Sequence, residues 1–264
     1  MKIALLQSQN IPLDVESNLG ALRAAAAEAV SAGAELLLTP ELFVTGYAPR
    51  ALAEWLTTER VAQLPERVAL IAAEQGIAIA ASLPGLAPAG GFEITAELWD
   101  AAGESVLRYG KVHLWDEAER SAFVPSERAP EVAEWNGRTV GFQVCYDIEF
   151  AEPTRYLATL GADLVLVPTA ITPVAAYIPE LLVRARAAEN NLVVAYADHA
   201  ATPGEGFAGL STVAGREGQL LAVADAAPGL LVAELPEVAP LEGEAADYLA
   251  DRRPELYASW PARA

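Results

Sequence analysis

The sequence predicts an α/β fold in which two sheets stack face to face and helices cover their outer faces. Strand-length apolar runs alternate with helical stretches in two comparable series, one on each side of a pair of hairpins. No linker-like segment divides the 264 residues. We therefore expect a single domain over residues 1–264, with an extended C-terminal tail from about residue 240.

The first series is expected to run strand, helix, strand, helix, strand. Each helical stretch ends before a glycine, Gly33 or Gly76, that suits the left-handed cap of a helix C-terminus. The expected elements, in chain order, are Ile3–Gln7, Asn18–Ala32, Glu35–Thr39, Arg60–Gln75 and Ile77–Ser82.

Turn signals mark two hairpins in the middle of the chain. Phe92–Trp99 and Ser105–Tyr109 are the expected strands of the first. Asn136-Gly137 marks the second, because this pair suits the positive φ angles of a type I′ turn. Before them, Ala89-Gly90-Gly91 lacks the Lys-Ser/Thr of a phosphate-binding loop, so we interpret it as a turn.

The second series again alternates helix and strand, and a last hairpin is expected at Phe207–Val223. The tail carries Tyr248, Tyr257 and Trp260 and shows no helix or strand period. The other expected elements are the helices Glu152–Leu160 and Pro179–Glu189 and the strands Asp163–Pro168, Leu192–Ala197 and Gly229–Leu235.

Composition excludes several classes of function. Hydrophobic residues make up 53% of the chain, which is enough for a large core. The net charge of −19 repels phosphate backbones and anionic lipid, so neither nucleic acid nor membrane is an expected partner. One cysteine and no apolar run typical of an export signal or a membrane span favour a reducing cytoplasm.

Cys145 is the most informative residue, because it stands where an apolar strand stops and a helical stretch begins. Open α/β sheets keep their chemistry at the carboxyl ends of strands. A lone thiol cannot form an internal disulfide, so Cys145 serves either packing or nucleophilic catalysis.

Two further polar residues follow apolar strands. Glu41 follows 36–40 and Lys111 follows 107–110, so that a base, a cation and a nucleophile can converge at sheet edges. Lys111 is one of only two lysines among 17 basic residues, which favours a narrow pocket that a guanidinium would not fit. From the residues alone, a helix-start acid or a surface charge is the favoured interpretation of Glu41, and Lys111 could equally be a solvated loop cation.

At these positions the chain resembles the nitrilase superfamily of carbon–nitrogen hydrolases, and within it the aliphatic amidases. The similarity covers nearly the whole chain and is carried by Pro-Glu-Leu-Phe at 40–43, Gly-Lys-Val-His-Leu at 110–114 and Cys-Tyr-Asp-Ile-Glu-Phe-Ala-Glu-Pro at 145–153. It implies a four-layer α-β-β-α sandwich and a Glu-Lys-Cys triad of Glu41, Lys111 and Cys145. A second glutamate eight positions after the lysine, here Glu119, is implied to hold the substrate amide.

The resemblance implies an amidase that cleaves small aliphatic amides through a cysteine thioester, without metal or cofactor. The backbone N–H of Tyr146 would help to stabilise the oxyanion, and Trp115 and Tyr47 are expected pocket walls. The two histidines, His113 and His199, lie far apart without a paired cysteine ligand, which disfavours a metal site.

Other interpretations stay open at this stage. A nitrilase or N-carbamoyl hydrolase would share the same triad, and a non-catalytic relative could serve as a binding or scaffold protein. A Cys-His protease is disfavoured by the scarcity of histidine. Because members of the superfamily usually assemble, with tails reaching across to a partner, we expect at least a homodimer.

Overall fold

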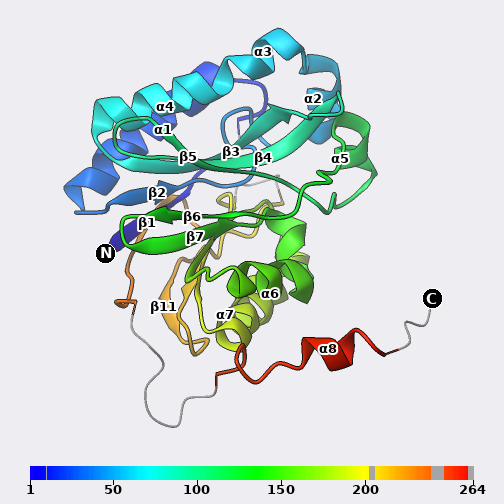
Figure 1. Ribbon diagram of the computed structural model, residues 1–264. Helices are drawn as coiled ribbons and strands as arrows, with labels where there is room; N and C mark the ends of the chain where they lie inside the picture. Colours follow the sequence, from blue (N-terminus) through cyan, green and yellow to red (C-terminus); the bar gives the residue numbers. More distant parts are fainter. Residues whose placement is uncertain (10, 202–205, 239–246, 261–264) are drawn as a thin grey trace.

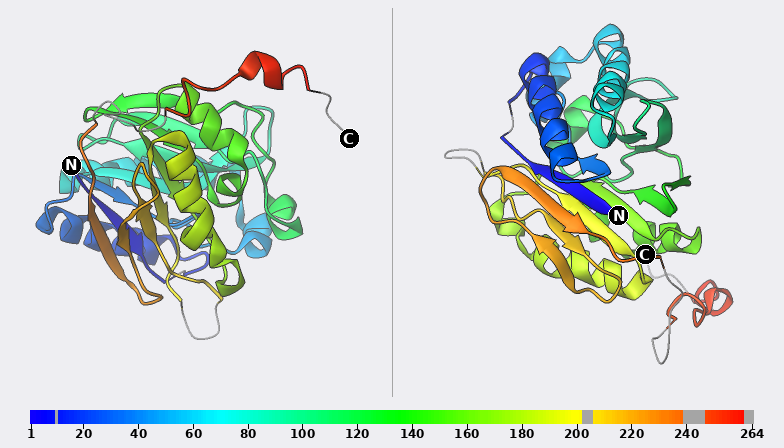
Figure 2. Two further views of the ribbon diagram at one scale, coloured as in Figure 1. Left: turned by 90° about the horizontal axis from the view of Figure 1, so that it is seen from below. Right: turned by 90° about the vertical axis from the view of Figure 1, so that its left-hand side faces the viewer.

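The computed structural model describes residues 1–9, 11–201, 206–238 and 247–260, and it contains two six-stranded sheets that face each other. Helices α1 and α4 lie outside the first sheet, and α6 and α7 lie outside the second (Figure 1). The right-hand view of Figure 2 shows the resulting order of helices, sheet, sheet and helices. The expected four-layer α-β-β-α sandwich is confirmed.

The two sheets are built alike, with parallel strands at the centre and antiparallel strands at the edges. In the first sheet β1, β2 and β3 are parallel, and in the second β7, β8 and β9 are parallel. In spatial order the first sheet consists of β12 (Gly229–Glu234), β1 (Lys2–Gln7), β2 (Leu36–Leu38), β3 (Ala78–Leu86), β4 (Phe92–Trp99) and β5 (Ser105–Gly110). The second consists of β11 (Leu220–Val223), β10 (Thr212–Ala214), β9 (Val193–Ala197), β8 (Leu164–Pro168), β7 (Arg138–Phe142) and β6 (Val132–Trp135).

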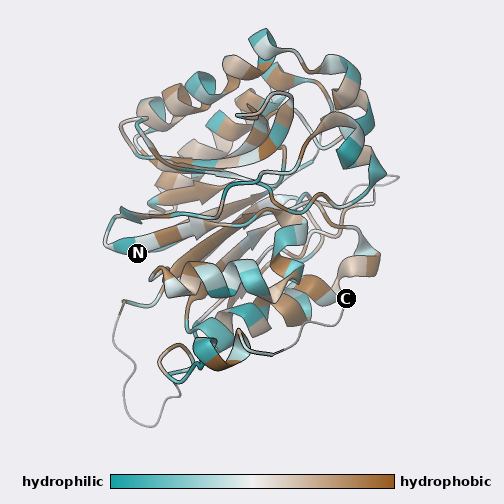
Figure 3. Ribbon diagram, turned by 45° about the vertical axis from the view of Figure 1, so that its right-hand side comes forward, coloured by the Kyte–Doolittle hydropathy of each residue, from teal (hydrophilic) through white to brown (hydrophobic). Residues whose placement is uncertain are grey.

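Successive side chains of a strand point to opposite faces of its sheet, and this alternation divides the core into two layers. In β1, Ile3 and Leu5 join the cluster that contains the strands of the second sheet. Ala4 and Leu6 point the other way and pack with the apolar face of α1 and α4. Figure 3 shows the strands at the centre of the molecule as its most hydrophobic part. Burial on both faces explains why the central strands read as continuous apolar runs.

The two long helices of the first series lie where they were expected, with shifted ends. α1 (Val15–Ser31) begins three residues early because the Asp14 side chain caps it, accepting from the Ser17 N–H at 3.0 Å. The single helix expected at Arg60–Gln75 is divided into α3 (Thr58–Ala62) and α4 (Leu64–Gln75). Pro65 at the start of α4 has no N–H to continue the first helix, which accounts for the break.

The helices over the second sheet also differ in detail from the expectation. α6 (Ala151–Thr159) agrees within one residue. The helix expected at Pro179–Glu189 is instead a π-helical turn, η3 (Ile178–Leu182), followed by α7 (Val183–Asn190). Elsewhere in the chain, the short helical elements that the sequence did not predict include α2 (Pro49–Trp55), α5 (Glu117–Ala122), η1 (Cys145–Glu149) and η2 (Pro173–Ala175).

The hairpin turn expected at Asn136-Gly137 is confirmed. Asn136 and Gly137 both have positive φ, +49° and +73°, and they join β6 to β7. In the last hairpin the strands are confined to β10 and β11, so that Phe207 to Ser211 are not part of a strand.

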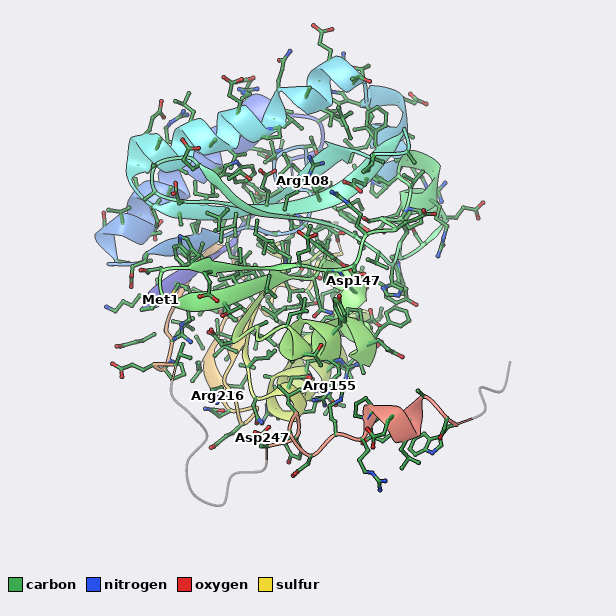
Figure 4. The ribbon with its side chains drawn as sticks, in the orientation of Figure 1. Met1, Arg108, Asp147, Arg155, Arg216 and Asp247 are labelled. Atoms are coloured by element: carbon green, nitrogen blue, oxygen red, sulfur yellow. The ribbon has the colours of Figure 1, made fainter. Side chains whose placement is uncertain are left out.

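The C-terminal segment runs alongside α6 before it projects from the body of the molecule (Figures 1 and 2). Arg155 of α6, labelled in Figure 4, lines a shallow cavity together with Tyr248 and Tyr257 of this segment. Contrary to the expectation of no regular structure, it contains the short helix α8 (Pro254–Tyr257). The expected start of the tail near residue 240 falls outside the described residues. Within the described ranges, no helix has both the length and the apolar character needed to cross a bilayer.

Candidate active site

Lys111 joins two carboxylates in the interior of the protein. Its Nζ donates to Glu41 Oε1 at 2.7 Å and to Glu119 Oε1 and Oε2 at 2.7 and 2.8 Å. All three side chains are completely buried. The alternative that Lys111 and Glu41 are ordinary solvated charges is therefore wrong.

Glu41 is held at the interface of the two sheets. It follows β2, its N–H donates to the Thr169 carbonyl just beyond β8 at 3.1 Å, and its own carbonyl contacts His199 Nε2 at 2.8 Å. The next residue, Leu42, has a φ of +50°, an uncommon value for a residue with a side chain. The Glu41 backbone is thus tied to segments that follow two strands of the second sheet, and the carboxylate Oε2 is buried with no hydrogen-bond partner among the described residues.

Glu119 is positioned by α5. The side chain of Asp116 caps this helix, accepting from the Glu119 N–H at 3.0 Å. Besides the Lys111 ammonium, the Glu119 carboxylate accepts from the Tyr47 hydroxyl and from the Trp115 N–H, each at 2.8 Å. These hydrogen bonds occupy the acceptor positions of both carboxylate oxygens.

Cys145 stands at a sharp turn between β7 and α6. Its φ is +48°, which is strained for any residue with a Cβ. Asp147, labelled in Figure 4, fixes this turn by accepting from the Val144 N–H at 3.1 Å, from the Tyr109 hydroxyl at 2.8 Å and from the His113 N–H at 2.9 Å. Strain maintained by a buried hydrogen-bonded anchor is typical of functional turns.

Glu41, Lys111, Glu119 and Cys145 form one cluster, in which each charge affects the pKa of its neighbours. Burial raises the pKa of Glu41 from 4.5 to about 8, against the opposing effect of the Lys111 charge. Burial also raises the pKa of the Cys145 thiol, and the Glu41 charge adds to this while Lys111 opposes it. Burial alone would lower the pKa of Lys111, but Glu41, Cys145 and Glu119 together raise it, so its ammonium stays charged.

A cavity of about 300 Å³ opens onto the thiol. Cys145 lies among its lining residues, with Glu149 as a charged neighbour and apolar or aromatic side chains around them. The other lining residues are Trp115, Tyr146, Ala170, Ile171, Thr172, Val174, Ala175, Tyr177 and Ile178. The cavity can hold a small, largely apolar molecule next to the sulfur.

The aromatic residues that were expected around the substrate lie in two separate places. Trp115 and Tyr146 line the cavity and contact each other edge to face at 5.0 Å between ring centroids. Tyr47 lies instead against Glu119, where burial and the nearby carboxylates raise the pKa of its hydroxyl and keep it a donor. Tyr177, which the sequence did not single out, takes a place in the cavity wall.

The structure explains two polar residues of the interior. Gln143, the residue directly after β7, accepts from Thr154 of α6 at 2.9 Å and donates to the Asp147 carbonyl at 3.3 Å. His199 is buried beside Glu41, and this burial lowers its pKa from 6.5 to about 4, which leaves the ring neutral. Sequence reasoning missed Asp147 and Glu149 as functional candidates, although both lie in the Cys145–Glu149 motif.

Neither histidine is arranged to activate the thiol. His113 Nδ1 contacts Asp147 Oδ1 at 2.9 Å and its ring stacks on Phe150, while His199 is engaged with the Glu41 carbonyl. Among the residues that the structure describes, no group of three or more His, Cys, Asp or Glu could hold a metal ion. The Glu41 carboxylate, by contrast, lies close enough to the thiol for each group to affect the pKa of the other.

The fold and this site together define a hydrolase of carbon–nitrogen bonds, and comparison with known proteins agrees. The chain matches the family model of carbon-nitrogen hydrolases over residues 2–239. It belongs to this family, and the resemblance to the nitrilase superfamily is confirmed.

Solved structures of an amidase from Nesterenkonia sp. share the fold. One is 45% identical with a TM-score of 0.91, and the match covers 99% of this chain and 96% of that chain. Other structures of that amidase show a complex with butyramide and a covalent addition at the active site cysteine. A hydrolase from Pseudomonas protegens is 37% identical over 97% of this chain and 90% of its own length.

Proposed function

We propose that the protein is an amidase that hydrolyses small aliphatic amides to a carboxylic acid and ammonia through a cysteine thioester. One observation carries this proposal: the Cys145 thiol lines a small, largely apolar cavity and is within electrostatic reach of the buried Glu41–Lys111–Glu119 group. The amidase from Nesterenkonia sp., which has been solved with butyramide, supports the substrate class.

The first half of the reaction forms the thioester. Cys145 Sγ attacks the amide carbon and Glu41 takes the thiol proton at its unpartnered Oε2. The raised pKa of Glu41 makes its carboxylate a stronger base, which reduces the energetic cost of the proton transfer from the thiol. The Lys111 ammonium and the Tyr146 N–H stabilise the oxyanion. Glu41 then returns the proton to the nitrogen, and ammonia leaves.

The second half releases the acid. Water enters where ammonia has left, Glu41 accepts a proton from it, and the resulting hydroxide attacks the thioester carbon. The tetrahedral intermediate expels the Cys145 sulfur, which recovers its proton from Glu41. Atoms and charges therefore balance with Glu41 as the single acid–base group.

Glu119 acts in this scheme as a positioning residue. Its carboxylate holds Lys111, Tyr47 and the Trp115 N–H in place. Because these donors fill its acceptor positions, a substrate N–H reaches Glu119 only by displacing one of them. Holding the substrate amide, the role that the resemblance implied, is therefore secondary to holding Lys111.

A substrate panel tests the proposed activity against its relatives. Ammonia release is measured with butyramide, butyronitrile and an N-carbamoyl amino acid, with Cys145→Ala protein as the background. We expect release from the amide. Release from only the nitrile or only the carbamoyl compound would assign the site to another branch of the superfamily. If no acylated protein appears by mass spectrometry with any of them, a binding or scaffold protein is the better description.

The pH dependence of the reaction provides a second test. The carboxylate form of Glu41 accepts the thiol proton, and its pKa of about 8 leaves it mostly protonated at neutral pH. The value of kcat/KM for butyramide should therefore rise about tenfold per pH unit up to about pH 8. A flat profile between about pH 5 and about pH 8 would exclude Glu41 as the base with this pKa.

We also propose that the protein assembles into at least a homodimer through the segment 247–260. This segment projects from the body and exposes large aromatic side chains, with Tyr248 and Trp260 51% and 61% exposed. Exposed apolar groups of this size are typical of interfaces. Light scattering on the purified protein measures the mass directly, and a monomer would dismiss the proposal.

A further inference from the structure

The cavity above Cys145 has a single charged wall. Of the described residues that line it, Glu149 alone has a side chain that is ionised in its ordinary state at neutral pH. The rim around Glu149 is apolar: Val174 and Tyr177 are 90% and 51% exposed, and Trp115 is 54% exposed. A charged group on a substrate would therefore meet Glu149 and few competing polar groups.

Glu149 is held in place by contacts on both sides. The Tyr177 hydroxyl donates to Glu149 Oε2 at 3.4 Å. The Glu149 carbonyl accepts from Nη2 of the buried Arg186 at 2.8 Å, and the adjacent Ile148 carbonyl accepts from the same guanidinium at 3.0 Å. Its side chain is half-buried, and this burial raises its pKa, although hydrogen bonding from Tyr177 and the Lys111 charge oppose the increase.

Among the described residues, no cation lines the cavity. The buried Lys111 ammonium already donates three hydrogen bonds to Glu41 and Glu119, so it is not free to pair with a carboxylate at the far end of an acyl chain. A carboxylate at the end of the substrate's acyl chain would enter a partly desolvated site without a counter-ion and close to Glu149. The effective dielectric constant of such sites makes like-charge repulsion stronger than in water.

We propose that Glu149 is a specificity-determining residue, which makes the cavity reject amides whose acyl chain ends in a carboxylate and accept neutral and cationic acyl chains. This inference rests on the proposed amidase function and narrows its substrate class. It predicts that the ω-amides of dicarboxylic acids, whose free carboxylate would meet Glu149, are poor substrates.

The test compares substrates of equal shape and different charge. Succinamate is paired with 4-methylvaleramide, and 3-aminopropanamide with butyramide. In the parent protein the anionic member of the first pair should have the lower kcat/KM. Glu149→Gln should raise the ratio of succinamate to 4-methylvaleramide about tenfold and lower the ratio of 3-aminopropanamide to butyramide. Glu149→Ser, a second neutral variant, should shift both ratios in the same directions.

Glu152→Gln is the matched control, because Glu152 lies three residues along the chain, is exposed and does not line the cavity. It removes the same charge and should leave both ratios unchanged. Ratios that stay at the parent values in Glu149→Gln and Glu149→Ser, or that shift equally in Glu152→Gln, would overturn the role of Glu149. If the parent protein releases ammonia from none of the four amides, the proposed function is overturned instead.

Discussion

Replacing Cys145 by alanine is expected to abolish turnover while the protein folds normally. Without the sulfur there is no acyl acceptor, and removing a nucleophile of this kind costs at least about 10⁴-fold in kcat. Cys145 is nearly fully buried, but alanine has the same Cβ and fits the same backbone. Ammonia release from butyramide measures the activity, and circular dichroism with thermal unfolding measures the fold.

Two further measurements make this result specific to sulfur chemistry. Cys145→Ser keeps the shape of the side chain but lacks the thiol, and it should also be inactive, since a hydroxyl is a much weaker acid. With the parent protein, brief exposure to substrate should add the mass of one acyl group, and this addition should be absent from Cys145→Ala. Butyramide turnover comparable with that of the parent would remove Cys145 from the mechanism.

The layered fold and the convergence of the cluster could be predicted from the sequence because they follow from short-range patterns. Apolar alternation and glycine caps predict the strands and helices. The carboxyl ends of parallel strands then bring Glu41 and Cys145 to corresponding edges of their sheets. The use of lysine at position 111, in a chain whose only other lysine is Lys2, indicated a narrow buried site, and the complete burial of Lys111 agrees.

The remaining features depend on tertiary contacts that no local pattern encodes. α5 has only six residues, and the burial of Glu119 within it depends on donors from Lys111, Tyr47 and the Trp115 backbone. The split of the expected helix at Pro65 was visible in the sequence, but the helical spacing on either side concealed it. The cavity walls contributed by Val174 and Tyr177 come from a region without a clear period.

Replacing Lys111 by methionine should cost both activity and stability. The substitution leaves Glu41 and Glu119 buried without a counter-ion, and breaking a buried ion pair in this way costs about 3–5 kcal/mol. Ammonia release should be lost as well, because the oxyanion loses its cation. Urea unfolding measures the free energy, and Lys2→Met is the matched control, since Lys2 is the other lysine of the chain and is exposed.

The sign of the pH effect distinguishes an unpaired charge from a simple loss of packing. The folded-state pKa of Glu41 is raised above its ordinary value of 4.5, so its contribution to stability is present below 4.5 and is lost as the pH rises through about 8. Without Lys111 the pKa rises further, and the stability deficit of Lys111→Met should shrink as the pH is lowered. Adding Glu119→Gln to Lys111→Met should recover part of the stability at neutral pH without recovering activity. A deficit that is independent of pH and unaffected by Glu119→Gln would show that Lys111 contributes only packing, and the buried cation could then no longer be the group that holds the two carboxylates together.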